Sequence, residues 1–380
     1  MTFKRNFGAK PMRIAIVGGI YGRDESFRRK LQVTPETILE RGFAARGCEI
    51  RTFSHYAAID MKQVDVVHVH HLSYGAVRAA VDKSQAAFVY TSHDPHAMSG
   101  LLHLHRQFAT QFVVSCADAV VALSKSEAEY QQRSYHLAGA RHAVIPNGID
   151  SANYTYARNN AAGRGRPWQL LYVGQLNALK SVDVLMRALP QVKQPVELEL
   201  VYHNSTLEIP LRKLAWELGL SERIRFLGPK NPRELAAMYQ RADAFVLPSA
   251  GEALPTVVTE AMFCGTPVVA TDVGGVREQL HGYGLCVPPG RPDELGAAIT
   301  CMFDRYEHFA AQSESASTYA KQRFAIEAMV DRHLELYADL LNKKGPRRRH
   351  KLFRVPIDAA LKMGISLICA TKCSPRSAFR

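Results

Sequence analysis

The chain has 380 residues, of which 47% are hydrophobic and 22% charged, a composition typical of soluble globular proteins. Its length exceeds that of one ordinary domain and suits two. The sequence holds no run of about 18 apolar residues, which a membrane-spanning helix needs, and no signal-peptide run near its start. Its seven cysteines include no CxxC pair, so we expect reduced cysteines in a cytoplasmic protein.

The net charge of +13 is concentrated in the last part of the chain. From residue 341 onward, eleven lysines and arginines stand against one acid, so this tail carries +10. Because the basic residues belong to a tail and not to a folded face, the charge does not indicate a nucleic-acid-binding protein.

Residues 357–369 of the tail combine apolar residues with a narrow polar stripe of Asp358, Lys362 and Ser366 at i+4 spacing. With the neighbouring basic block, this pattern predicts a helix lying on an anionic membrane, which would place the protein peripherally at the inner face. Gly364 weakens the helix, and a basic extension without regular structure is an equal alternative.

A regular alternation of apolar and helical segments begins near the N-terminus. The helix predicted from Thr34 to Phe43 has a capping threonine and Pro35 in its first turn. The segments predicted as strands are 13–17, 48–53, 64–69, 87–91 and 119–123. This order predicts a parallel sheet with helices on both faces, in a first domain at residues 12–150.

Residues 151–167 have the polar, glycine-containing composition of a linker. The alternation restarts afterwards, which predicts a second domain at residues 168–322 and a helix at 323–341 that returns to the first domain. Residues 342–380 form the tail. The predicted fold class is α/β, with two doubly wound Rossmann-like domains, and a ligand touching both would lie in the cleft between them.

Two carboxylates, Glu252 and Glu260, stand eight residues apart in the second domain. The pattern predicts a buried strand at 243–248, a loop, and a helix at 256–264 with Gly265 as its C-cap. An unpaired buried carboxylate costs several kcal/mol, so each glutamate needs a polar partner. Glu252 follows the carboxyl end of a strand, where open α/β sheets bind ligands.

Several predicted strand ends suit phosphate groups. Gly18-Gly19 and Gly274-Gly275 would let backbone N–H groups come close, and Lys180 is predicted at the start of a helix. Each glycine pair alone is weak evidence, since turns use the same residues.

Histidines gather near two predicted strand ends, at positions 68, 70, 71, 93 and 96. Because side chains alternate along a strand, His68 and His70 share a face and could bind one metal ion. Contacts to a ligand in a polar cleft are the favoured interpretation, and no metal site is predicted.

Several segments together resemble the retaining glycosyltransferases of the GT-B fold, glycosyltransferase family 4. They are 144–150, 172–176, 180–185, 218–228, 241–249 and the segment from Glu252 to Glu260, and the resemblance spans residues 13–340. It implies sugar transfer from a UDP- or GDP-linked donor to a glycan or lipid-linked acceptor, with retained configuration and without a metal or cofactor.

The resemblance also implies roles for individual residues. Glu252 would meet the sugar hydroxyls, Glu260 the ribose and Lys180 the diphosphate, while His93 would contact the sugar at the reacting centre. The catalytic residues implied are His93, Glu252 and Lys180. The donor-binding residues implied are Gly18, Gly19, Gln175, Ala253, Leu254, Pro255, Thr256, Glu260, Gly274 and Gly275.

Two positions depart from the family pattern. Gln175 stands where the family commonly has arginine, and residues 200–205 replace a glycine-rich turn. Either His203 or Arg277 helps to hold the donor, or activity is weak.

Three functions are compatible with these residues. The leading hypothesis is a transferase in cell-surface polysaccharide or lipopolysaccharide assembly. A sugar-nucleotide epimerase or phosphorylase of the GT-B fold and a non-catalytic nucleotide-sugar-binding scaffold are the alternatives.

Overall fold

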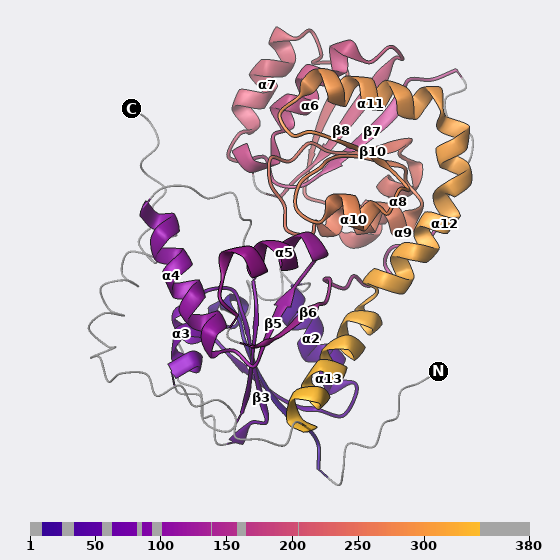
Figure 1. The fold of residues 1–380 in the computed structure, drawn as a ribbon. Helices are drawn as coiled ribbons and strands as arrows, with labels where there is room; N and C mark the ends of the chain where they lie inside the picture. Colours follow the sequence, from indigo (N-terminus) through magenta and orange to yellow (C-terminus); the bar gives the residue numbers. More distant parts are fainter. Residues whose placement is uncertain are drawn as a thin grey trace. The chain divides into compact units, whose positions relative to one another are not determined.

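The computed structural model describes residues 10–24, 34–54, 63–81, 86–92, 101–137, 139–157, 165–203 and 205–342 (Figure 1). They form two compact units, each built on a six-stranded sheet. The first unit comprises Met1–Ala122, Tyr130–Ala143 and His333–Arg380, and the second Leu123–Glu129 and Val144–Arg332. Residues 123–129 and 144–150, which the sequence places with the first domain, thus group with the second unit.

The sheet of the first unit has the strand order β2-β1-β3-β4-β5-β6. Strands β3 and β4 are buried at every position, as expected for parallel strands covered on both faces. The strands are β1 (Arg13–Val17), β2 (Glu49–Phe53), β3 (Val66–His70), β4 (Ala87–Thr91), β5 (Ala119–Ala122) and β6 (Arg141–Val144). The accompanying helices are η1 (Gly19–Gly22), α2 (Pro35–Ala44), α3 (Tyr74–Val81), α4 (Leu101–Cys116) and α5 (Lys125–Ser134).

The chain proceeds from β1 to β2 on one side and then to β3 on the other side of β1. This reversal creates a topological switch point between the carboxyl ends of β1 and β3. Ligands of open α/β sheets bind at such points.

The sheet of the second unit has the order β12-β11-β10-β7-β8-β9. Its strands are β7 (Trp168–Val173), β8 (Val196–Val201), β9 (Ile224–Gly228), β10 (Ala244–Leu247), β11 (Val268–Thr271) and β12 (Leu285–Val287). Its helices are η3 (Ala178–Lys180), α6 (Val182–Ala188), η4 (Leu189–Gln191), α7 (Glu208–Glu217), α8 (Pro232–Arg241), α9 (Thr256–Cys264), α10 (Val276–Leu280), α11 (Pro292–Asp304) and α12 (Tyr306–Phe324). The last helix, α13 (Ile326–Asn342), begins in the second unit and belongs to the first unit from His333 onward. The chain builds outward from β7 to β9 and then from β10 to β12, so the switch point lies between β7 and β10.

Local sequence signals set several of these boundaries. Asn231 accepts a hydrogen bond from the backbone N–H of Glu234, whose side chain accepts one in return, and Pro232 opens α8. Gly265 ends α9 in the left-handed conformation, at φ 81°. The predicted helix 256–264 is therefore confirmed at both ends.

His68 and His70 share a face, as predicted, but they lie in the core of the first unit and do not line a polar cleft. Their ring centroids are 4.2 Å apart. The two ring nitrogens of His68 form hydrogen bonds with Thr91 Oγ1 at 2.7 Å and with the Tyr337 hydroxyl at 2.6 Å. The expectation that these two histidines contact a ligand is wrong, because both side chains are buried in the core, where His68 bonds to Thr91 and to Tyr337 of α13.

None of the helices within the described ranges is long and apolar enough to cross a membrane. The tail at 343–380, with its predicted interfacial helix, lies outside the described residues, as does His93.

Candidate functional site

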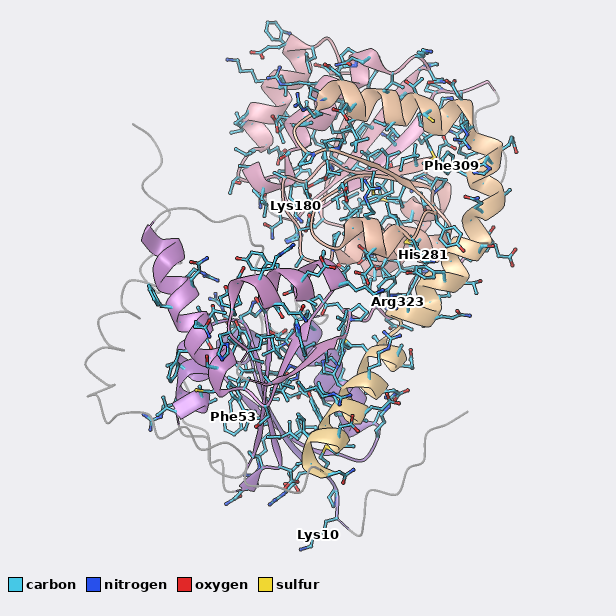
Figure 2. All side chains as sticks on the ribbon, in the orientation of Figure 1. Lys10, Phe53, Lys180, His281, Phe309 and Arg323 are labelled. Carbon is cyan, nitrogen blue, oxygen red and sulfur yellow. The ribbon has the colours of Figure 1, made fainter. Side chains whose placement is uncertain are left out.

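Two loops of the second unit follow the strands that flank its switch point. One runs from the end of β7 to Lys180, and the other runs from the end of β10 to Pro255. Figure 2 labels Lys180 in this unit. These loops carry most of the residues that the sequence singled out in the second domain.

An ion pair joins the two loops. Lys180 Nζ lies 2.5 Å from Glu252 Oε1, and Ser249 Oγ donates a hydrogen bond of 2.6 Å to the same oxygen. The side chains of Lys180 and Glu252 are 20% and 10% exposed, so both are largely shielded while still open to a ligand. Glu252 thus has the polar partner that its setting requires.

The sequence predicts Lys180 at the start of a helix, but in the structure Lys180 is the last residue of the 3₁₀ turn η3. The Asn177 side chain accepts a hydrogen bond of 3.1 Å from the backbone N–H of Lys180, capping this turn. Ser181 then adopts a left-handed conformation at φ 47°, and α6 begins only at Val182. The extra turn lets the Lys180 side chain reach Glu252.

A third loop, after β11, supports the Glu252 loop through its glycines. Gly275 N donates to Ala253 O at 2.9 Å, and Thr271 Oγ1 donates to Ser249 O at 2.6 Å. Gly274 has φ 54°, and a Cβ there would stand 2.0 Å from Glu252 O. Only glycine fits at 274, so this residue fixes the backbone that presents Glu252.

Gln175 lies in the same group of loops. The Tyr172 hydroxyl donates to Gln175 O at 2.7 Å, and Asn177 Nδ2 donates to Gln175 Oε1 at 2.8 Å. The amide carbonyl of Gln175 is therefore used inside the loop, and its NH₂ group remains the part that could meet an anionic ligand.

Helix α9 begins at Thr256, directly after the loop. Its N-cap is Pro255, and no described side chain caps the first turn. Gln279 Nε2 donates to Pro255 O at 2.9 Å and to Thr259 Oγ1 at 2.5 Å, which fixes the start of the helix. The first N–H groups of such a helix can bind an anion.

Glu260 has partners of its own on the side of α9 that packs against α8. Tyr239 OH donates a hydrogen bond of 3.0 Å to Glu260 Oε2, and Tyr154 is a second hydroxyl donor. Burial raises the pKa of Glu260 to about 7, and the two tyrosine hydrogen bonds oppose that rise. The two glutamates are thus placed in separate polar settings.

In the first unit, Gly18 and Gly19 lie at the carboxyl end of β1. Gly18 N donates to Phe53 O at 3.0 Å, and Gly19 opens the turn η1. A Cβ at Gly18 would stand 2.8 Å from Cγ of Glu36, so a carboxylate lies against this glycine. The expected role of these two glycines in phosphate binding stays a prediction, and the nearby negative charge weighs against it.

The sequence reasoning missed several polar partners in these loops. Ser249 and Asn177 hold Glu252 and Lys180, while Tyr154 and Tyr239 hold Glu260. Ser249 carried a local signal, because a serine three residues before a turn glutamate can bond to it. The tyrosines carried none, because they reach Glu260 from distant segments.

Within the described residues, no group of three or more histidine, cysteine, aspartate or glutamate side chains is placed so that it could hold a metal ion. In the described loops the cation nearest to Glu252 is Lys180.

Two family models match the chain. Residues 21–153 match Glycosyltransferase Family 4, and residues 157–323 match Glycosyl transferases group 1. A D-inositol 3-phosphate glycosyltransferase of Thermobispora bispora is 31% identical over 306 residues, which cover 73% of this chain and 71% of that protein. The enzyme of the same description from Corynebacterium urealyticum is 29% identical over 319 residues, covering 75% and 74%.

Solved structures share the fold at lower identity. Sucrose-phosphate synthase from Thermosynechococcus elongatus matches with a TM-score of 0.73 and 20% identity, over 87% of this chain and 99% of that one. HepE of Anabaena in complex with UDP and glucose matches with a TM-score of 0.65 and 21% identity, over 86% and 100%. These similarities establish the GT-B fold.

Proposed function

Because the chain belongs to glycosyltransferase family 4, we propose that it transfers a sugar, with retained configuration, from a UDP- or GDP-linked donor to an acceptor hydroxyl. The observation that carries the proposal is the ion pair between Lys180 and Glu252 at the switch point of the second sheet. A cation and a carboxylate side by side match the two ends of a nucleotide-sugar, its diphosphate and its sugar hydroxyls.

Glu252 binds the sugar in this proposal. Ser249 and Lys180 both approach Oε1, which leaves Oε2 to accept hydrogen bonds from sugar hydroxyls. Charge-assisted bonds of this kind are stronger than neutral ones and give orientation as well as affinity.

Lys180 and the first turn of α9 stabilise the departing diphosphate. As the bond to the sugar loosens, negative charge grows on the phosphate oxygens, and preorganised cations and N–H dipoles lower the energy of that state. The acceptor hydroxyl enters on the face that the diphosphate leaves, so configuration is retained. The leaving phosphate oxygen takes the acceptor proton, and His93, outside the described residues, would contact the sugar.

Lys180 would supply the positive charge that other transferases take from a metal ion, so the proposed reaction needs no metal and no cofactor. Glu260 would accept hydrogen bonds from the ribose hydroxyls. The NH₂ group of Gln175 would contact the diphosphate more weakly than an arginine there, since it carries no charge.

The acceptor is the least defined part of the proposal. The names of the curated relatives point to an inositol phosphate, and they lend no support to the lipopolysaccharide or polysaccharide role expected from the sequence. We therefore place D-inositol 3-phosphate first among acceptors, ahead of glycan and lipid-linked ones. Binding of the basic tail to anionic membranes at the inner face stays a separate prediction.

An assay of nucleotide release tests the proposal. Purified protein is incubated with UDP- and GDP-sugars, each with D-inositol 3-phosphate, with membrane extract or without acceptor, and the anomeric configuration of the product is read by NMR. We expect one donor to be turned over with retention, and Glu252→Ala to lower the rate at least a hundredfold. Donor binding without turnover under every condition would favour a binding scaffold instead.

A further inference from the structure

The switch point of the first sheet carries a carboxylate and an imidazole that the proposed donor site does not use. Glu36 lies in the first turn of α2, next to the carboxyl end of β1, and His71 directly follows β3. Strands β1 and β3 are neighbours in the sheet, so both side chains belong to the edge where ligands of such sheets bind.

Glu36 is buried although it carries a carboxylate. Its side chain is 5% exposed, and Gly18 makes room for it, because a Cβ at residue 18 would stand 2.8 Å from Glu36 Cγ. The one ion-pair contact shown for this carboxylate within the described residues is His71 Nε2, 3.9 Å from Oε1. That distance is longer than a hydrogen bond, so the pair does not fully replace the water that the carboxylate loses on burial.

His71 has an unusual backbone conformation. Its φ of 65° is left-handed, which is uncommon for a residue other than glycine, and its backbone N–H donates to Thr91 O at 3.0 Å. The hydrogen bond fixes the backbone, and the imidazole reaches Glu36 while staying 33% exposed. Backbone strain of this kind concentrates at ligand-binding positions.

We propose that Glu36 and His71 form a binding pair for a hydroxyl group of the acceptor. This inference rests on the proposed function and adds the residues that select the acceptor. One hydroxyl oxygen can lie about 2.8 Å from both Oε1 and Nε2, donating its hydrogen to the carboxylate and accepting one from the imidazole. The pair thus takes a neutral polyhydroxyl compound and disfavours a phosphate group, which the carboxylate repels.

The Glu36–His71 pair also gives Gly18 a different role from the one that its sequence suggested. A glycine pair at the first strand end resembles a phosphate loop, but here the space that the missing side chain leaves is filled by Glu36. In this proposal the phosphate of a substrate such as D-inositol 3-phosphate points away from the pair, and a ring hydroxyl points toward it.

Two variants test the pair without removing its packing. Glu36→Gln keeps the shape and removes the charge, and His71→Asn keeps a residue that tolerates the left-handed conformation. Glu40→Gln is the matched control, because Glu40 lies one turn further on α2 and accepts a hydrogen bond of 3.0 Å from Tyr21 instead.

Kinetics provide the first measurement. With D-inositol 3-phosphate as acceptor, we expect Glu36→Gln and His71→Asn to lower kcat/KM for the acceptor at least tenfold. In these two variants the acceptor constant should change more than the KM for the donor, and every constant of Glu40→Gln should stay within twofold of wild type. Unchanged acceptor constants in both variants would contradict the proposal that Glu36 and His71 bind the acceptor.

Binding provides a second measurement that does not depend on turnover. In protein labelled with ¹⁵N in histidine, the His71 signals, identified by their loss in His71→Asn, should shift when myo-inositol or D-inositol 3-phosphate is added, and the shift should be lost in Glu36→Gln. Shifts without turnover would support the pair and count against the proposed function. If the His71 signals move with neither compound, the proposed role of Glu36 and His71 in acceptor binding is wrong, even if the enzyme is active.

Discussion

Glu252 and Glu260 have different neighbours in the second unit. Glu252 lies against Lys180, whereas Glu260 accepts hydrogen bonds from two tyrosines, Tyr239 and Tyr154. Two tyrosine hydroxyls do not compensate fully for the loss of water, so the pKa of Glu260 rises to about 7.

Glu260 should make the stability of the protein depend on pH. Its pKa rises from 4.5 to about 7 on folding, so between these values the folded state holds a proton that the unfolded state releases. The free energy of unfolding contributed by this group is highest below pH 4.5 and falls as the pH rises toward 7. We expect Glu260→Gln to be more stable than wild type at pH 8, by up to about 3 kcal/mol, and no more stable at pH 4.5, as measured by urea unfolding.

The same protonation should weaken nucleotide binding if Glu260 accepts hydrogen bonds from the ribose, because a protonated carboxyl is a poorer acceptor. Titration of wild type with UDP and GDP should give a Kd that rises as the pH falls from 8 to 6. A Kd independent of pH in this range would argue against contact between Glu260 and the ribose.

Lys180 should matter for nucleotide affinity far more than for stability. We expect Lys180→Ala to weaken binding of UDP or GDP about 10- to 100-fold, since hydrogen bonds to charged groups contribute about 1.5–3 kcal/mol. Lys213→Ala is the control, because Lys213 is exposed on α7, where it pairs with Glu217 at 3.6 Å. Equal nucleotide affinities in the two variants, measured by calorimetry, would contradict the donor site.

At the scale of elements, three loops of the second unit form one support for Glu252. The loop after β7 is tied to the loop after β10 by Ala250 N donating to Leu179 O at 2.8 Å, and the loop after β11 is tied to the loop after β10 by Gly275 N donating to Ala253 O. Gly274 is the point of closest approach, where any side chain would overlap Glu252 O. The position of the carboxylate therefore depends on a residue that need not touch the donor.

Gly274→Ala should abolish nucleotide binding and lower the midpoint of thermal unfolding. The matched control is Gly282→Ala, since Gly282 also has a positive φ, of 87°, but no described atom lies within 4 Å of a Cβ there. We expect Gly282→Ala to cost about 1 kcal/mol of backbone strain and to leave the nucleotide-dependent shift in melting temperature unchanged. Similar behaviour of both variants in a thermal-shift assay would show that steric overlap at Gly274 is unimportant.

The elements that sequence could predict are those bounded by local signals. The end of helix α9 was located because Gly265 is a C-cap signal. The turn that carries Lys180 was missed, since no local pattern distinguishes a 3₁₀ turn capped by Asn177 from the first turn of a helix.

The site was predictable where a residue and its partner lie close in sequence or on a recognised motif. Glu252 and Glu260 were found because charges among apolar residues stand out. Glu36 was missed because a glutamate in the first turn of a helix is expected to be exposed and to interact with the helix dipole. Its burial comes from packing on Gly18, eighteen residues earlier, which no pattern within α2 shows.

At the scale of the whole molecule, helix α13 links two units that are not continuous in sequence. Its first seven residues belong to the second unit and the rest, from His333, to the first. In the first unit it contributes Tyr337, fully buried, whose hydroxyl bonds to His68 at 2.6 Å. The core of the first sheet is thus completed by residues near the end of the chain.

Tyr337→Phe should destabilise the first unit, because it leaves a ring nitrogen of the buried His68 without its hydrogen bond. We expect the free energy of unfolding to fall by about 1–3 kcal/mol in urea. Asp339→Asn on the same helix is the control, since its ion pair with Arg141 at 3.0 Å is about half exposed on both sides and should change stability by less than about 1 kcal/mol. An equal loss in both variants would mean that the buried bond contributes nothing specific.

The hydrogen bond between His68 and Tyr337 joins residues 269 positions apart, and this has a consequence for how the protein is made. Translation proceeds at about 5–20 residues per second, so roughly ten to fifty seconds pass between the synthesis of the two partners. For that time the nascent first sheet has no Tyr337 to cover His68, while the whole second unit is being synthesised. The core around His68 is therefore completed only after the second unit has been synthesised.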